Sequence, residues 1–187
     1  MMEDYFATLG LRQALVLDDA QLKDAWHQAA AAASDAEEIH RAYSALRDPA
    51  RRIGHLLERH GRTPAGAETP GARLFDLFFT VAAVLKNADA IVTQIESAAS
   101  ALQRAGQTPR LLTSLDDLTS AGAAVAAEKA TRDTQLTSLA EKFPHMSNAE
   151  WDLLTSLGSD FAFLTKWAAE IQKRETRLQE TLMGKIV

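Results

Sequence analysis

The stretch "EEIHRAYSALRDPARRIGHLLERHG", residues 37–61, predicts two short helices joined by one turn. Apolar side chains recur at intervals of three or four residues on both sides of the turn: Ile39, Ala42, Tyr43 and Leu46 before it, and Ile53, Leu56 and Leu57 after it. Asp48-Pro49 separates the two helices, because proline disfavours helix at the residue that precedes it. Gly61 is suited to end the second helix, since glycine readily adopts the left-handed conformation found there. The stretch therefore predicts a pair of packed helices.

Two further helices are expected upstream of this pair. The first covers about residues 3–9 and carries Tyr5, Phe6 and Leu9. The second starts at Asp18 or Asp19, both good N-cap residues. We therefore interpret residues 1–62 as an N-terminal helical unit. The Gly- and Pro-rich stretch that follows predicts a domain boundary, with a linker over residues 63–70.

Residues 71–187 predict three long helices, over about 71–104, 112–142 and 148–183. The first has an apolar seven-residue repeat that includes Leu74, Leu77, Val81, Val84, Ala88, Ile91, Ile95, Ala98 and Leu102. The third has a similar stripe made of Leu154, Leu157, Phe161, Leu164, Ala168, Ile171, Leu178 and Leu182. Such repeats are typical of helices packed nearly antiparallel in a bundle. Lys129 and Arg132 interrupt the stripe of the second helix and are expected to weaken it. The fold class is all-α: a small helical unit followed by an antiparallel three-helix bundle.

Composition argues against several classes of function. The net charge of −5 disfavours broad nucleic-acid binding, and no apolar run is long enough to span a bilayer. The chain has no cysteine, and its five histidines show no metal-type pair four residues apart. We found no phosphate-binding loop, nucleophile elbow or zinc-protease motif. We therefore expect a cytoplasmic, non-enzymatic protein without a cofactor.

Three segments of the N-terminal unit resemble a J domain. They are "DYFATLGL" (residues 4–11), "LDDAQLKDAWHQAA" (17–30) and the stretch 37–61. The last contains a recurrent pattern of the HscB-type iron–sulfur co-chaperones, here Ala42-Tyr43, Leu46-Arg47, Pro49, Arg52, Leu56-Leu57 and His60-Gly61. Residues 150–182 also look like the last helix of that family, so the resemblance covers nearly the whole chain in the right order.

One motif of that family is absent. J domains carry His-Pro-Asp after the second helix, and this tripeptide stimulates the ATPase of a DnaK- or HscA-type chaperone. The sequence has Ser34, Asp35 and Ala36 at the matching positions, with room only for a tight turn. The second helix also lacks the family's basic face and has alanines at 29–33 instead. The resemblance thus implies that chaperone stimulation is impaired or lost, and that any chaperone contact is weak; the unit could equally serve only to brace the bundle.

In the family, an apolar patch on the C-terminal bundle binds the iron–sulfur scaffold protein. Matching "LFDLF" and "DFAFLTKW" to that pattern gives the candidates Leu74, Phe75, Phe78 and Phe163, and the helical periodicity adds Phe79. At about 100° per residue, Phe75 and Phe79 lie off the apolar stripe of their helix, as does Phe163. Large apolar residues outside such a stripe either pack on another domain or bind a partner. Leu74 and Phe78 are also consistent with the core.

The basic run over residues 47–62 has two interpretations. Arg47, Arg51, Arg52, Arg59 and Arg62, with His55 and His60, could form a solvated face or a docking surface for an acidic partner. The preferred hypothesis for the whole chain is a co-chaperone-like adaptor for iron–sulfur cluster assembly, which binds a scaffold or another client protein. The alternative is a repurposed all-helical structural protein that keeps the fold and serves another assembly.

Overall fold

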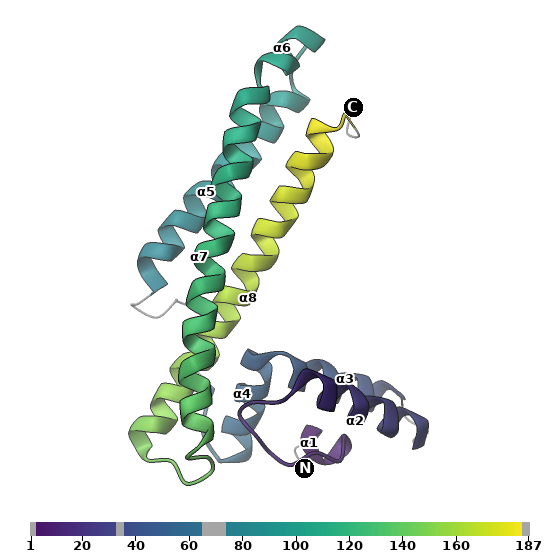
Figure 1. Ribbon diagram of the computed structural model, residues 1–187, viewed down its shortest axis with the longest axis vertical. Coiled ribbons are helices and arrows are strands. Elements are labelled where there is room, and N and C mark those ends of the chain that lie inside the picture. Colours follow the sequence, from purple (N-terminus) through teal and green to yellow (C-terminus); the bar gives the residue numbers. More distant parts are fainter. Residues whose placement is uncertain (1–2, 33–35, 65–73, 185–187) are drawn as a thin grey trace. The chain divides into compact units, whose positions relative to one another are not determined.

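The computed structural model describes residues 3–32, 36–64 and 74–184, which form eight helices and no strand (Figure 1). The helices are α1 (Tyr5–Thr8), α2 (Asp19–Ala32), α3 (Ala36–Arg47), α4 (Pro49–Arg59), α5 (Phe75–Glu96), α6 (Ala101–Gly106), α7 (Thr108–Ala140) and α8 (Asn148–Leu182). The all-α prediction is thereby confirmed. Among these helices, none combines the length and the hydropathy that a membrane crossing requires.

The chain divides into two compact units, which we describe separately. Unit 1 comprises Met1–Thr69 and Thr131–Ala162, and unit 2 comprises Pro70–Ala130 and Phe163–Val187. The long helices α7 and α8 therefore contribute one segment to each unit. The sequence did not indicate this division of the long helices, because their apolar stripes continue across both segments.

Unit 1 has a single apolar core to which every one of its helices contributes. Helix α3 packs against α1, α2 and α4. The end of α7 and the start of α8 complete the core with large side chains. Its large buried side chains include Phe6, Leu15, Leu22, Leu46, Ile53, Leu56, Leu57, Leu136, Leu154, Leu157 and Phe161. Because the N-terminal helices are short, their stability depends on this shared packing.

The ends of α4 are those predicted from the sequence. Asp48 caps its N-terminus, where Oδ1 accepts a hydrogen bond of 2.8 Å from the Ala50 amide, and Pro49 occupies the first helical position. At the other end, Gly61 has a φ of 68°. The Arg62 amide donates back to the Leu57 carbonyl at 2.8 Å, as in a Schellman ending.

Unit 2 is an up-down-up bundle of α5 with segments of α7 and α8. Arg110 of α7 donates to Gln94 of α5 at 3.0 Å, so the start of α7 lies beside the end of α5 and the two helices are antiparallel. Arg174 and Arg177 of α8 pair with Asp89 and Glu96 of α5, which makes α5 and α8 parallel. Figure 1 shows the same directions. The core contains Leu74, Val81, Ala88, Ile91, Val92, Leu111, Leu118, Val125, Leu164, Trp167, Ile171 and Leu178.

The first bundle helix is shorter than predicted. Instead of running to about residue 104, α5 ends at Glu96, and α6 starts after Ser100. The Ser100 hydroxyl accepts from the Gln103 amide at 3.2 Å, while the Gln103 side chain accepts from the Ala99 amide at 2.9 Å. These reciprocal bonds begin a new helix and satisfy backbone groups that a continuous helix would bond internally. Leu102, predicted to be in the bundle stripe, is consequently 83% exposed.

Two other positions of the predicted stripes are wrong. Ala168 and Leu182 of α8 are exposed, because the helix turns these positions away from its neighbours. Arg132, which was expected to weaken the stripe of α7, is buried there and paired with Asp160. Lys129, by contrast, is exposed.

Candidate partner-binding surfaces

The residues that carry the N-terminal resemblance hold unit 1 together. Arg52 is buried; its Nε donates to the Leu15 carbonyl at 3.0 Å and its Nη1 to the Leu46 carbonyl at 2.7 Å. These bonds connect α4 to the loop before α2 and to the end of α3. Burial lowers the pKa of Arg52, although Asp48, Asp133 and Asp19 act in the opposite direction.

The basic run does not form one solvated face. Arg52 and His55 are buried, whereas Arg47 and Arg51 are exposed. Nε2 of His55 accepts a hydrogen bond of 3.3 Å from the Tyr5 amide, and the two rings stack with centroids 4.4 Å apart. Burial lowers the pKa of His55 below its ordinary value of 6.5.

The outer arginines of the run serve contacts within unit 1. Arg59 pairs at 2.6 Å with Asp4, the residue that caps α1. Arg62 donates to the Asn148 side chain at 2.7 Å and lies over the Trp151 ring. A docking surface for an acidic partner would therefore have to rely on fewer cations than the sequence suggested.

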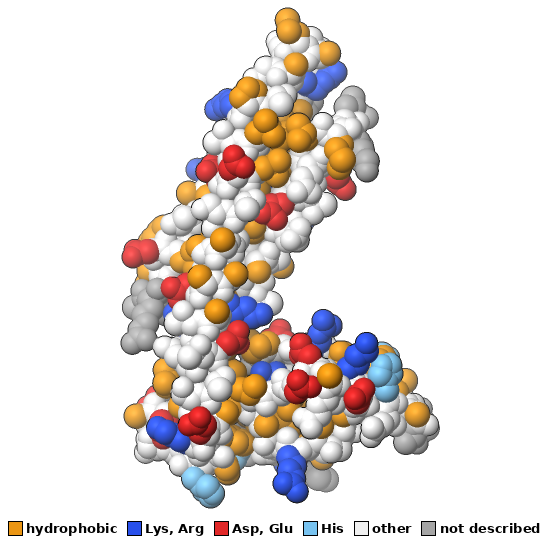
Figure 2. Space-filling view, in the orientation of Figure 1, with side chains coloured by type: hydrophobic (Ala, Val, Ile, Leu, Met, Phe, Trp, Pro, Cys, Tyr) orange, Lys and Arg blue, Asp and Glu red, His pale blue; other side chains and the backbone are white. Residues whose placement is uncertain are grey.

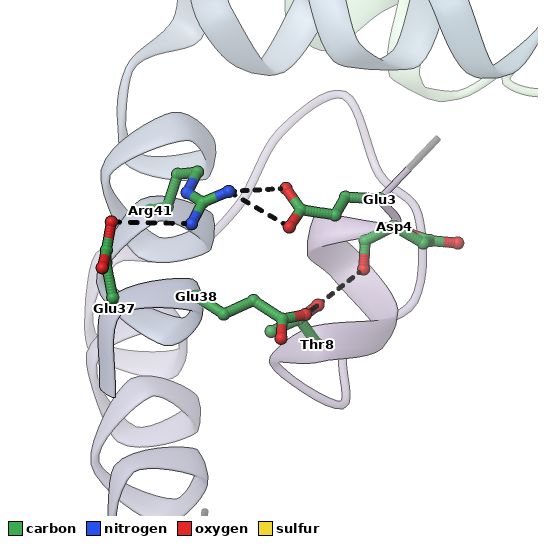
Figure 3. Close-up of polar contacts among 6 residues, drawn as sticks. All are labelled: Glu3, Asp4, Thr8, Glu37, Glu38 and Arg41. Atoms are coloured by element: carbon green, nitrogen blue, oxygen red, sulfur yellow. Dashed lines mark hydrogen bonds and ion pairs between the residues drawn. The ribbon is translucent and has the colours of Figure 1, made fainter. Parts of the chain in front are cut away.

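The position of the chaperone tripeptide lies mostly outside the described residues. This is the case for Ser34 and Asp35, while Ala36 is the exposed first residue of α3. The next turn of α3 contacts α1 (Figure 3). Arg41 of α3 bonds both carboxylate oxygens of Glu3, at 3.2 and 3.3 Å, and the Thr8 hydroxyl bonds Glu38 at 3.2 Å. The acidic start of α3 thus helps to hold α1 in place.

The start of α5 presents two exposed aromatic side chains. Phe79 is 64% exposed and Phe75 is 39% exposed. They are four residues apart and so share one side of the helix. Leu74 and Val81 are buried on the other side. The prediction that the two phenylalanines lie off the apolar stripe of their helix is consistent with these exposures.

The remaining candidates lie in the core of unit 2 or pack against it. Leu74 is fully buried, and Phe78 and Phe163 are half-buried against that core. Phe78 contacts Phe79 with ring centroids 5.4 Å apart, and both Phe78 and Phe163 contact Trp167, at 6.1 and 5.7 Å. We call the set Phe75, Phe78, Phe79 and Phe163 the aromatic patch. Trp167 thus connects Phe78 on α5 with Phe163 on α8, a contact between two helices that the periodicity of one helix does not indicate.

The aromatic patch has the chemistry of a protein-binding surface. Exposed aromatic residues supported by a packed core are typical binding hot spots, because their rings are already held in place before the partner arrives. Asp76, between Phe75 and Phe79 in the sequence, is also exposed. Within the described parts of the chain, no three metal-ligating side chains gather at one place.

Comparison with known proteins identifies the fold. The described residues form two compact units and are all-α. Among solved structures, the chain is similar to the chaperone HscB from Vibrio cholerae, with a TM-score of 0.55 and 19% sequence identity, over 94% of this chain and 99% of that one. No protein-family model and no curated protein matches the chain. The similarity establishes an HscB-like fold.

Proposed function

We propose that this protein is a non-enzymatic, co-chaperone-like adaptor that binds an iron–sulfur scaffold protein or another client through the aromatic patch. The observation that carries the proposal is the exposure of Phe75 and Phe79 at the start of α5, in a chain with an HscB-like fold. Full burial of an exposed phenylalanine contributes about 1.5–3 kcal/mol, of which Phe79, 64% exposed, would supply the larger part and Phe75, 39% exposed, a smaller one. That is enough for them to dominate the affinity of a transient complex.

The second part of the proposal is that stimulation of a DnaK- or HscA-type chaperone is impaired or lost. The support is the sequence Ser34-Asp35-Ala36 where the related proteins have His-Pro-Asp. The alanines of α2 also support a loss of chaperone stimulation, because an exposed alanine offers no charge to a partner surface. The adaptor would then hold its client without driving a nucleotide cycle, in the cytoplasm.

Two assays with purified full-length protein test the two parts separately. Capture of the host's purified iron–sulfur scaffold protein tests the first part, and we expect a saturable complex. A single-turnover ATPase assay with the host's DnaK-type chaperone tests the second, and we expect no acceleration. Failure to bind the scaffold would favour the alternative, an all-helical interaction protein of another assembly. Clear ATPase stimulation would contradict the interpretation of residues 34–36.

A further inference from the structure

Unit 2 has an apolar groove at the end of the bundle where α5 stops and α6 begins. The groove has a volume of about 420 Å³. Ile95 of α5, Ala105 of α6, Leu111 of α7 and Leu182 of α8 provide its apolar lining. Helix α5 ends at Glu96, and the groove lies where the start of α7 and the end of α8 extend past that point.

Large apolar side chains are exposed around this groove. They are Leu102, Leu112, Leu182 and Met183. Leu102 lies three residues from Ala105 on α6 and therefore near the same side of that helix. Figure 2 shows hydrophobic side chains gathered at the α6 end of the bundle, with Lys or Arg side chains at its edge. Apolar surface concentrated in this way is typical of an interaction site.

The charges beside the groove favour an acidic partner. Glu96 is already paired with Arg177, at 2.8 Å. Arg104 and Arg110 instead donate to neutral oxygens, the Ala98 carbonyl at 3.4 Å and the Gln94 amide at 3.0 Å. Over residues 94–112 and 177–184 the chain has three arginines and two glutamates, whereas its net charge is −5. This end of the bundle thus has a net charge of about +1, and Arg104 and Arg110 are the cations whose described hydrogen bonds go to neutral oxygens and not to a carboxylate.

We propose that this groove is a second docking site, which binds an amphipathic helical segment of another protein that carries acidic residues. Apolar side chains of the segment would contact Ile95, Leu111 and Leu182, and its carboxylates would bond Arg104 and Arg110. Helical segments bind apolar grooves in this way through residues spaced three or four apart. The site differs from the aromatic patch: Phe79 and Ile95 are sixteen residues apart on α5, or about 24 Å. Two such sites would let one chain hold two partners.

Site-specific photo-crosslinking in host cells tests the proposal. A benzophenone amino acid replaces Leu182 in the full-length chain, and in a control it replaces Leu153, another exposed leucine of α8. Crosslinked peptides are then identified by mass spectrometry. We expect position 182, and not position 153, to capture a defined segment with apolar residues three or four apart and a net negative charge. The combined change Arg104→Glu and Arg110→Glu should lower the yield about tenfold.

Further variants separate this proposal from that for the aromatic patch. Phe79→Asp should leave crosslinking at position 182 unchanged, because Phe79 belongs to the aromatic patch and does not line the groove. A synthetic peptide of the captured segment should bind the wild-type chain about tenfold more tightly than the double arginine variant. Capture of a second copy of this chain, of a neutral or basic segment, or of nothing beyond the control would overturn the proposal.

Discussion

Nε of Arg132 lies 2.7 Å from Oδ2 of Asp160, and the two side chains are only 4% and 8% exposed. The pair joins the last turns of α7 to the first turns of α8 inside unit 1. Desolvating two charges is costly, and close approach offsets that cost only while both partners are present. We therefore infer that the pair helps to align the two helices.

Replacing Asp160 with alanine should destabilise unit 1 by about 3 kcal/mol, because the buried guanidinium loses this carboxylate. Urea unfolding followed by circular dichroism measures the change. Asp152→Ala, at an exposed position of the same helix, is the matched control and should alter stability by less than about 0.5 kcal/mol.

The combined change Arg132→Met and Asp160→Leu should recover most of the lost stability, because apolar side chains of similar size can replace a buried ion pair. If Asp160→Ala is as mild as the control, the pair does not align the helices as described.

This ion pair also shows what the sequence could not predict. Arg132 was interpreted as a weak point of the α7 stripe, because a periodicity argument considers one helix at a time. Its partner Asp160 is 28 residues away, and only the packing of two helices brings them together. The local features, by contrast, were predicted well: the break at Asp48-Pro49, the Gly61 ending and the all-α class depend on neighbouring residues.

The break between α5 and α6 gives a second prediction. Leu102→Ser should change stability by less than about 0.5 kcal/mol, since the side chain is exposed. Leu118→Ala should cost about 2–5 kcal/mol, because Leu118 is fully buried in the core of unit 2. Thermal unfolding of the two variants checks the difference. A continuous helix over 71–104 would instead make Leu102→Ser strongly destabilising.

Stability should depend on pH through His55. Burial lowers its pKa in the folded state, so the unfolded chain binds the proton more tightly. The contribution of the neutral ring is therefore present above the ordinary pKa of 6.5 and is lost as the pH falls toward the lowered folded value. Protonation would also remove the acceptor that Nε2 offers to the Tyr5 amide.

Urea unfolding from about pH 8 to pH 5 measures this dependence. His55→Gln should flatten the curve, because glutamine does not titrate in this range. His60→Gln is a useful comparison, since burial and Arg59 also lower the pKa of His60. If the free energy of unfolding of His55→Gln depends on pH as steeply as that of the wild type, other groups cause the dependence.

Restoring the tripeptide tests the interpretation of the chaperone motif. The changes Ser34→His, Asp35→Pro and Ala36→Asp should raise chaperone ATPase stimulation only slightly, because α2 still lacks a basic face. Adding Gln28→Lys and Ala31→Lys, both at exposed positions of α2, should raise it further. Single-turnover ATPase rates measure both variants against the wild-type chain. Full stimulation by the wild type would contradict the account.

The aromatic patch was predicted only in part. The helical spacing correctly indicated that Phe75 and Phe79 lie off the stripe, since this depends on one helix. It could not indicate how Phe78 and Phe163 are held, because Trp167 connects them across two helices. The groove beside α6 was missed altogether, since a continuous helix was expected where α5 ends.

The most direct test of the account is the affinity of the Phe79→Asp variant for the host's iron–sulfur scaffold protein, measured by isothermal titration calorimetry beside the wild type. Phe79 is 64% exposed, so the variant should fold normally. We predict that affinity falls about 30-fold or more, corresponding to a hot spot of at least about 2 kcal/mol, while Leu153→Asp binds like the wild type. Equal binding by wild type and Phe79→Asp would contradict the central claim that this patch holds the partner.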